Sequence, residues 1–177
     1  MTLATAILLF VTAQRLLELL LARRNTRRLL ARGAYEAGAE HYPVMVALHT
    51  AWLVTLWVLG WNRPVNLILL GLFVVMQILR IWVIAALGGR WTTRIIVLPA
   101  APLVSKGPFR LVRHPNYCIV TAEIALLPLA LGLPGVALLF TLLNAAMLTV
   151  RIGCENRALA RAGRASPRPI QPMKQAR

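Results

Sequence analysis

Charged residues are scarce in this chain, and acidic residues are the scarcest of all. Of its 177 residues 14% are charged, and these comprise 5 Asp and Glu against 20 Lys and Arg. A soluble domain of this length carries charge on about a quarter of its residues. The shortage of charge, together with a mean hydropathy of +0.69, excludes an ordinary soluble globular domain.

Cysteine is nearly absent, and the familiar catalytic signatures are missing. The sequence contains no glycine-rich dinucleotide or phosphate loop, no H-E-x-x-H metal motif and no G-x-S-x-G nucleophile motif. The cysteines and histidines follow no ligand pattern, so we expect no metal site. We expect no disulfide either, because Cys118 and Cys154 both fall on the cytoplasmic side of the topology predicted below.

Long apolar runs are abundant. Five of them are bounded by polar or turn residues, at Leu3–Ala22, Val44–Trp61, Val65–Leu87, Tyr117–Leu131 and Gly135–Val150. Runs of roughly 17–23 apolar residues cross a membrane as a helix, whereas the last two runs have about fifteen and suit a tight hairpin. We predict an all-α polytopic integral membrane protein with five transmembrane helices. It forms one domain over residues 1–162, and the proline-containing stretch 163–177 is predicted to be a disordered basic tail.

Almost all Lys and Arg residues lie in loops on one side of this five-span arrangement. They follow the first run, separate the third from the fourth, and follow the fifth, whereas Arg63 alone lies in an opposite loop. The positive-inside rule then places the N-terminus outside and the basic loops in the cytoplasm. Nucleic-acid binding is disfavoured, because it needs one contiguous basic face. The excess of Arg over Lys suggests a bacterial source, and we expect the protein in the bacterial plasma membrane.

Four ionisable residues lie inside the apolar runs, where a charge is costly to bury. Arg15 and Glu18 are three apart in the first run and can pair on one helix face, and Arg80 lies at a depth from which it also reaches Glu18. Glu123 lies level with Asn144 in the hairpin, so it either contacts Asn144 or faces a substrate. A membrane transporter, with these charges along a conduction path, is a rival interpretation.

Two polar clusters flank the predicted hairpin, whose turn is Pro134-Gly135. The first ends at His114 and Tyr117, and the second runs from Arg151 to Glu155. Folding the chain back at the turn puts these clusters at the same level. Arg151 and Glu155 are four apart and share a helix face. We therefore predict a pocket at the lipid–water boundary that contains imidazole, phenolic, guanidinium and carboxylate groups.

The residues of these clusters resemble a known family. The run Val104-Ser105-Lys106-Gly107-Pro108-Phe109 through Arg113-His114-Pro115-Asn116-Tyr117, followed across the hairpin by Arg151-x-x-x-Glu155, resembles the isoprenylcysteine carboxyl methyltransferase family. That family consists of membrane methyltransferases that use S-adenosylmethionine. The resemblance covers roughly residues 88–159, and the amino-terminal half looks like a bacterial branch of the family.

The resemblance implies a cofactor pocket on the cytoplasmic face. Leu103, Val104 and Phe109 would line S-adenosylmethionine, His114, Pro115, Asn116 and Tyr117 would wrap it, and Glu155 would hydrogen-bond to it. Arg151 would face the methyl acceptor. The chain departs from the family pattern at Asn156, usually a second Glu, and at Ile119, usually Gly. Ala101 and Phe109 stand where eukaryotic members have His and Tyr.

Two classes of lipophilic acceptor stay open. A carboxylate of the isoprenylcysteine type is already ionised at neutral pH, so Arg151 would only have to orient it. A phenolic polyketide lipid, such as an alkylresorcinol or alkylpyrone, needs a base, for which His114 and Glu123 are candidates. A membrane scaffold without catalysis is a further rival, and it would lack saturable S-adenosylmethionine binding.

Overall fold

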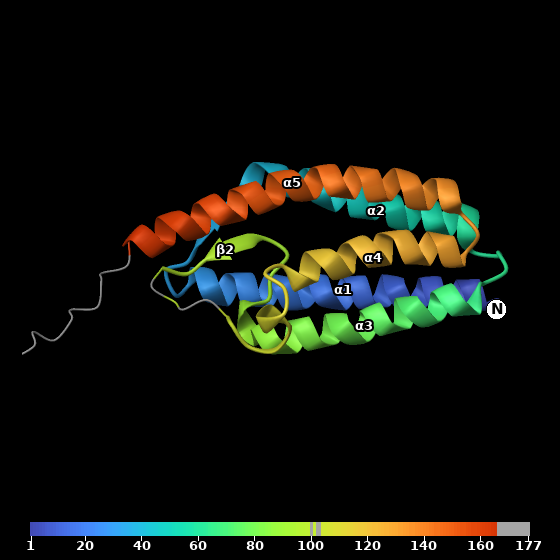
Figure 1. Cartoon of the computed structure of the whole chain (residues 1–177), viewed down its shortest axis with the longest axis horizontal. Helices are drawn as coiled ribbons and strands as arrows, with labels where there is room; N and C mark the ends of the chain where they lie inside the picture. Colours follow the sequence, from blue (N-terminus) through green and yellow to red (C-terminus); the bar gives the residue numbers. More distant parts are fainter. Residues whose placement is uncertain (100, 102–103, 166–177) are drawn as a thin grey trace, which may run out of the picture.

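The computed structural model describes residues 1–99, 101 and 104–165. Its described part is an elongated bundle of five helices, namely α1 (Leu3–Leu30), α2 (Tyr42–Gly60), α3 (Leu67–Leu87), α4 (Pro115–Ala130) and α5 (Pro134–Ala165) (Figure 1). Within those residues, α1, α2, α3 and α5 are long and apolar enough to cross a membrane, and α4 is a shorter apolar helix. The predicted all-α polytopic membrane fold is confirmed.

The connections at one end of the bundle contain a small sheet that the sequence did not predict. Strands β1 (Tyr35–Ala37) and β2 (Ile95–Val97) pair antiparallel, with Ala37 opposite Ile95. Three short 3-10 helices lie in the same connections, η1 (Ala39–His41), η2 (Gly88–Arg90) and η3 (Gly107–Arg110). Ala158 of α5 packs on Ile95 and Val97. The sheet therefore joins the two long connections to α5.

Local sequence explains where the helices begin and turn. The Oδ1 atom of Asn66 caps α3 by accepting hydrogen bonds from the backbone N–H groups of Ile68 (3.0 Å) and Leu69 (3.1 Å). Between α4 and α5, Gly132 has φ 68°, a left-handed conformation that glycine adopts at low cost. The backbone N–H of Leu133 then bonds to the carbonyl of Pro128 at 2.8 Å. The result is the tight hairpin that the sequence predicts.

The interior of the bundle is apolar toward the α4–α5 turn, and its outer surface is apolar as well. Trp52, Leu56 and Phe73 are fully buried between the helices. Outward-facing side chains such as Ile68 (79% exposed) and Val58 (66% exposed) remain uncovered. A helix that is hydrophobic all round suits lipid contact on its outer face. The exposed apolar surface therefore agrees with a protein that is embedded in a bilayer.

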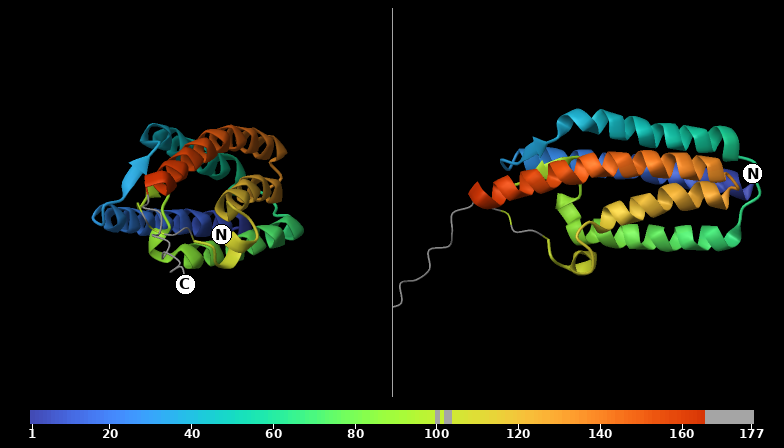
Figure 2. Two further views of the ribbon diagram at one scale, coloured as in Figure 1. Left: turned by 60° about the vertical axis from the view of Figure 1, so that its left-hand side comes forward. Right: turned by 45° about the horizontal axis from the view of Figure 1, so that its top comes forward.

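At the other end of the bundle, two helices continue beyond the predicted membrane spans. Helix α1 continues to Leu30, beyond the predicted end of the span at Ala22, and its end lies beside the β1–β2 sheet (Figure 2). Helix α5 continues to Ala165, just past the predicted start of the tail. Residues 166–177 lie outside the described residues, so the disordered tail stays a prediction.

Candidate functional site

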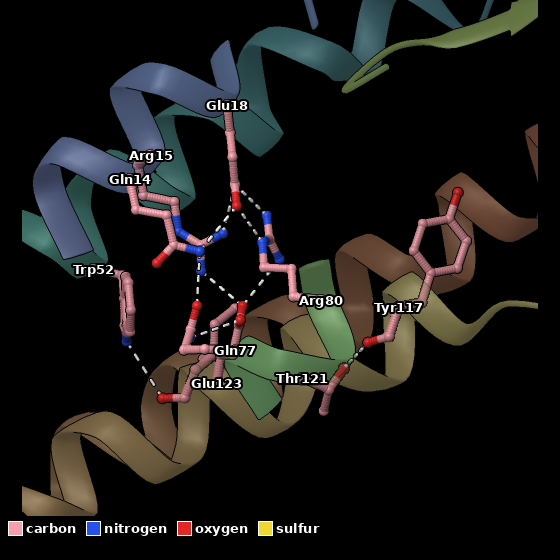
Figure 3. Close-up of polar contacts among 10 residues, drawn as sticks. Gln14, Arg15, Glu18, Trp52, Gln77, Arg80, Tyr117, Thr121 and Glu123 are labelled. Carbon is pink, nitrogen blue, oxygen red and sulfur yellow. Dashed lines mark hydrogen bonds and ion pairs between the residues drawn. The ribbon is translucent and has the colours of Figure 1, made fainter. Parts of the chain in front are cut away.

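A closed set of polar side chains, here called the ionic cluster, lies among α1, α3 and α4 (Figure 3). Its members are Gln14, Arg15, Glu18, Gln77, Arg80 and Glu123. Arg80 donates to both oxygens of Glu18 (2.6 and 2.5 Å) and to Oε2 of Glu123 (3.0 Å). Arg15 donates to Glu18 (3.1 Å) and to Glu123 (2.7 Å). The predicted pairing of Glu18 with Arg15 and Arg80 is confirmed.

Glu123 belongs to this cluster and is fully buried. Gln77 donates to Oε1 of Glu123 at 2.9 Å, so both carboxylate oxygens are bonded to protein groups. The predicted contact of Glu123 with Asn144 is wrong, because the Nδ2 atom of Asn144 donates to Oγ1 of Thr121 at 3.1 Å. Two arginines balance two glutamates, and Glu123 does not join the other predicted site residues. A closed, paired set of charges is typical of an interhelical anchor.

A second set of side chains, here called the hairpin cluster, contains four of the predicted site residues: His114, Tyr117, Arg151 and Glu155. Tyr117 at the start of α4 donates its hydroxyl hydrogen bond to Oε2 of Glu155 on α5. Nδ1 of His114 lies 3.8 Å from the same oxygen, and its ring stacks on Tyr117 with centroids 5.3 Å apart. The hairpin therefore brings the two polar clusters of the sequence together, as predicted.

Arg151 organises the hairpin cluster from within. Its Nε donates to the Tyr117 hydroxyl at 3.0 Å, and its Nη2 donates to the carbonyl of Thr93 at 2.8 Å. Its Nη1 lies 3.1 Å from the sulfur of Met45 on α2. With 7% of the residue exposed, all three guanidinium nitrogens have protein partners. Arg151 thus connects α5 with α2, α4 and the loop before β2, and these three bonds use three of its five N–H donors.

The structure describes four of the remaining predicted cofactor residues, in the loop before α4 and in the first turn of that helix. Val104 and Phe109 are half-buried in the loop before α4, and Pro115 is buried in its first turn. Asn116 carries the most informative atom, because its Oδ1 is buried and has no hydrogen-bond partner among the described residues. Buried acceptors are nearly always paired, so Oδ1 is available to a donor from outside the described residues. Leu103 lies outside the described residues.

The loop before α4 is held against α3 at a glycine. Gly107 has φ +60°, and a Cβ at this position would lie 3.4 Å from Nε1 of Trp82 and from the Ala86 side chain. Because a positive φ favours glycine, the Lys106-Gly107-Pro108 sequence fixes where the loop turns. Phe109 follows within the same 3-10 helix, η3.

Sequence reasoning did not identify the residues that support this end of the bundle. Met45 and Thr93 contact Arg151, and Arg94 donates to both oxygens of Glu36 at 2.9 and 2.8 Å. The hydrogen bond to Glu36 raises the pKa of the Arg94 guanidinium. The only sequence signal was the β-branched run of β2, which brings Arg94 next to β1. The contacts themselves depend on packing between distant segments.

Comparisons with known proteins show the family of this chain. The model of the isoprenylcysteine carboxyl methyltransferase family matches residues 69–161, which include every member of that cluster. The uncharacterized protein YpbQ of Bacillus subtilis (strain 168) is 38% identical over 151 residues, which cover 82% of this chain and 90% of that protein. No solved structure matches this chain. The family match spans more than half of the sequence, and so the chain belongs to the isoprenylcysteine carboxyl methyltransferase family, a family of membrane methyltransferases.

Proposed function

We propose that this protein is an S-adenosylmethionine-dependent O-methyltransferase that acts on a lipophilic acceptor at the hairpin cluster. One observation carries the proposal. His114 and Tyr117 meet Arg151 and Glu155 across the α4–α5 hairpin, although Tyr117 and Glu155 are 38 residues apart in the chain. These groups lie at the end of the bundle that holds the long connections. If this end lies at the lipid–water boundary, as the sequence predicts, a polar cofactor and a lipid-soluble acceptor can meet there.

The residues present fit the cofactor. S-adenosylmethionine has amine and hydroxyl donors and a positively charged sulfonium. The unpaired Oδ1 of Asn116 is an acceptor, and the side chains of His114 and Glu155 are 24% and 27% exposed, so they face accessible space. Pro115 follows His114 directly in the chain, and the resemblance adds Leu103, Val104 and Phe109 as apolar residues that would line the cofactor. The cofactor would supply an electrophilic methyl group.

Each side chain of the hairpin cluster is assigned its own role in binding and positioning the reactants. Glu155 offers a negative charge, Tyr117 fixes the position of that carboxylate, and Arg151 fixes the Tyr117 hydroxyl. A fixed donor and acceptor set lowers the entropic cost of aligning two reactants. We assign Arg151 to positioning of the Tyr117 hydroxyl, and we assign contact with the acceptor to the two N–H donors that its three bonds leave unused.

The acceptor is proposed to be a carboxylate, as the family resemblance implies. A carboxylate with an ordinary pKa near 4 is ionised throughout the neutral range and needs no base. A phenolic lipid is the second candidate, and one observation favours it. His114 lies 3.8 Å from the Glu155 carboxylate, an arrangement that can accept a proton and stabilise the resulting imidazolium.

The pH dependence of the rate separates the two acceptors. Single-turnover rates with saturating methyl donor should be flat between about pH 6 and 8 for a carboxylate, because the acceptor is already charged. For a phenol the rate should rise with pH, by up to about tenfold per unit, until the base or the phenol is deprotonated. Labelled methyl transfer into lipid extracts identifies the acceptor directly.

The function itself is tested by cofactor binding. Calorimetry of the full chain in neutral detergent should show saturable S-adenosylmethionine binding. Glu155→Ala should weaken it about ten- to a hundredfold, because a hydrogen bond to a charged group is worth about 1.5–3 kcal/mol. Arg161→Ala, an exposed change farther along α5, is the matched control and should bind normally. Unchanged affinity in a folded Glu155→Ala protein would contradict the proposed site.

We further propose that the hairpin cluster faces the cytoplasm, in the plasma membrane of a bacterium. The proposal rests on the placement of the basic residues. In the described connections, Arg63 between α2 and α3 is the lone cation at one end of the bundle, while the other basic segments lie at the opposite end, where the hairpin cluster lies (Figure 1). Cysteine probes at Asn62 and at Asn156 should therefore be labelled from opposite sides of the membrane.

A further inference from the structure

We propose that the last two turns of α1 form a binding site for the headgroup of an anionic phospholipid. The site consists of Arg23, Arg24, Arg27 and Arg28, here called the α1 arginine cluster. These residues take no part in the hairpin cluster or the ionic cluster. The inference does not depend on the proposed methyl transfer.

The α1 arginine cluster is a concentration of charge without internal compensation. All four side chains are exposed, and none has a hydrogen-bond or ion-pair partner within residues 1–99, 101 and 104–165. Arg23 and Arg27, and likewise Arg24 and Arg28, are four apart, a spacing at which like charges on a helix repel. The helix dipole stabilises cations in the last turn, where Arg27 and Arg28 lie. It does little for Arg23 and Arg24 one turn earlier, so an external anion would relieve the repulsion among these cations.

The cluster lies on a fixed helix surface and not on a free segment. Ala22, Asn25 and Leu29 form the buried stripe of these turns. Nδ2 of Asn25 donates to the carbonyl of Trp91 at 2.8 Å and to the carbonyl of Gly88 at 3.3 Å. Because Asn25 holds the helix against the connection after α3, the arginines on the remaining faces are directed away from the protein. A preorganised surface binds with less entropy loss than a flexible one.

The depth of the cluster matches a phospholipid headgroup. Helix α1 has 28 residues, or about 42 Å at 1.5 Å per residue, which exceeds a hydrocarbon core of about 30 Å. The first twenty residues reach Ala22, so Arg23 begins at the edge of that core. Directly before it, Leu17 (66% exposed) and Leu20 (61% exposed) offer apolar surface to acyl chains.

The chemistry of the cluster selects an anionic lipid. A guanidinium donates paired hydrogen bonds to phosphate oxygens, and two arginines one turn apart can hold one phosphate from both sides. A zwitterionic headgroup carries its own cation, which several arginines repel. The combination of phosphate-binding groups, surplus positive charge and adjacent apolar surface therefore indicates a phospholipid such as phosphatidylglycerol.

The test is a calorimetric titration of the full chain in neutral detergent with dihexanoyl-phosphatidylglycerol. Dihexanoyl-phosphatidylcholine and inorganic phosphate serve as the other two probes. Phosphatidylglycerol should bind saturably, phosphatidylcholine at least tenfold more weakly, and inorganic phosphate should not displace the bound lipid. Arg23→Gln/Arg24→Gln should lose affinity by about fivefold for each arginine removed. Arg23→Lys/Arg24→Lys, which keeps the charge, should lose less.

The matched control is Arg157→Gln/Arg161→Gln, which removes two exposed arginines from α5 near the same end of the bundle. Circular dichroism and size-exclusion chromatography confirm that each variant is folded. Equal losses in the two glutamine variants would show a general charge effect and overturn the proposal. Equal binding of the two phospholipids, full displacement by inorganic phosphate, or wild-type affinity in folded Arg23→Gln/Arg24→Gln would overturn it as well.

Discussion

The ionic cluster and the hairpin cluster both contain arginine and glutamate side chains, but they differ in how many of their polar atoms have protein partners. In the ionic cluster, the charged atoms of Arg80 and Glu123 bond to other members of the cluster, and Glu123 is fully buried. In the hairpin cluster, His114 and Glu155 are partly exposed, and Oδ1 of Asn116 has no partner among the described residues. A closed set of charges holds helices together, whereas an open one leaves bonding capacity for a ligand.

The two clusters also share one helix, and that arrangement has a consequence for function. Helix α4 contributes Glu123 to the ionic cluster and Tyr117 to the hairpin cluster, and Thr121 between them donates to the carbonyl of Tyr117 at 2.9 Å (Figure 3). At 16 residues α4 is too short for membrane thickness to set its depth. Pairing of Glu123 with α1 and α3 fixes that depth, and with it the level of Tyr117 in the hairpin cluster.

The largest expected effect is loss of stability when the ionic cluster is broken. Arg80→Met leaves a buried carboxylate without its guanidinium, and we expect the free energy of unfolding in mixed micelles to fall by about 3–5 kcal/mol. Arg80→Met/Glu123→Gln removes one charge of each sign and should recover part of that loss. A decrease below about 1 kcal/mol for the single change would mean that the cluster is not the anchor described here.

A smaller and different effect is expected at the hairpin cluster. Tyr117→Phe removes the hydroxyl that joins Arg151 to Glu155, so S-adenosylmethionine affinity should fall about tenfold, as for the loss of one hydrogen bond. Calorimetry measures the affinity, and unfolding in mixed micelles measures the stability. Arg80→Met protein that remains folded at low temperature should bind the cofactor within about threefold of wild type. Equal losses of S-adenosylmethionine affinity in Tyr117→Phe and Arg80→Met would contradict the assignment of cofactor binding to the hairpin cluster alone.

The smallest expected effect is at the surface pair of Arg94 and Glu36, whose side chains are 40% and 20% exposed. Arg94→Gln should cost at most about 1 kcal/mol of unfolding free energy, since solvent screens the pair. The pKa of Arg94 is raised, so its contribution is present below the unfolded pKa of arginine and is lost only as pH rises through the folded one. The effect of Arg94→Gln should therefore be the same at pH 6 and pH 9. If the effect of Arg94→Gln on the unfolding free energy declined markedly between pH 6 and pH 9, another group would have to titrate in that interval.

The sequence predicted correctly those features that depend on the depth of a residue along its helix. Apolar run length gives the spans, and the Pro134 turn sets which residues of α4 and α5 are level. Tyr117 therefore reaches Glu155, and Thr121 reaches Asn144. The same comparison of depth in the hairpin predicted a contact between Glu123 and Asn144, and that prediction was wrong. Glu123 lies two residues beyond Thr121, about 200° around the helix, and so it faces α1 and α3 instead.

The remaining features depend on packing that no local pattern encodes. Gln14 and Gln77 complete the ionic cluster, yet a glutamine in an apolar run does not indicate its partner. Met45 and Thr93 reach Arg151 only because α2 and the connection after α3 lie against α5. Rotation about the helix axes and loop conformation determine these contacts, and both are properties of the assembled bundle.

The most direct test of the open hairpin cluster is S-adenosylmethionine binding to Asn116→Leu, measured beside its unfolding free energy. Oδ1 of Asn116 has no partner among the described residues, so its removal breaks no hydrogen bond that the structure contains. The account predicts that affinity falls about tenfold, the value of one hydrogen bond, while stability stays the same or rises. Wild-type affinity in the folded variant would contradict a cofactor site at this end of α4.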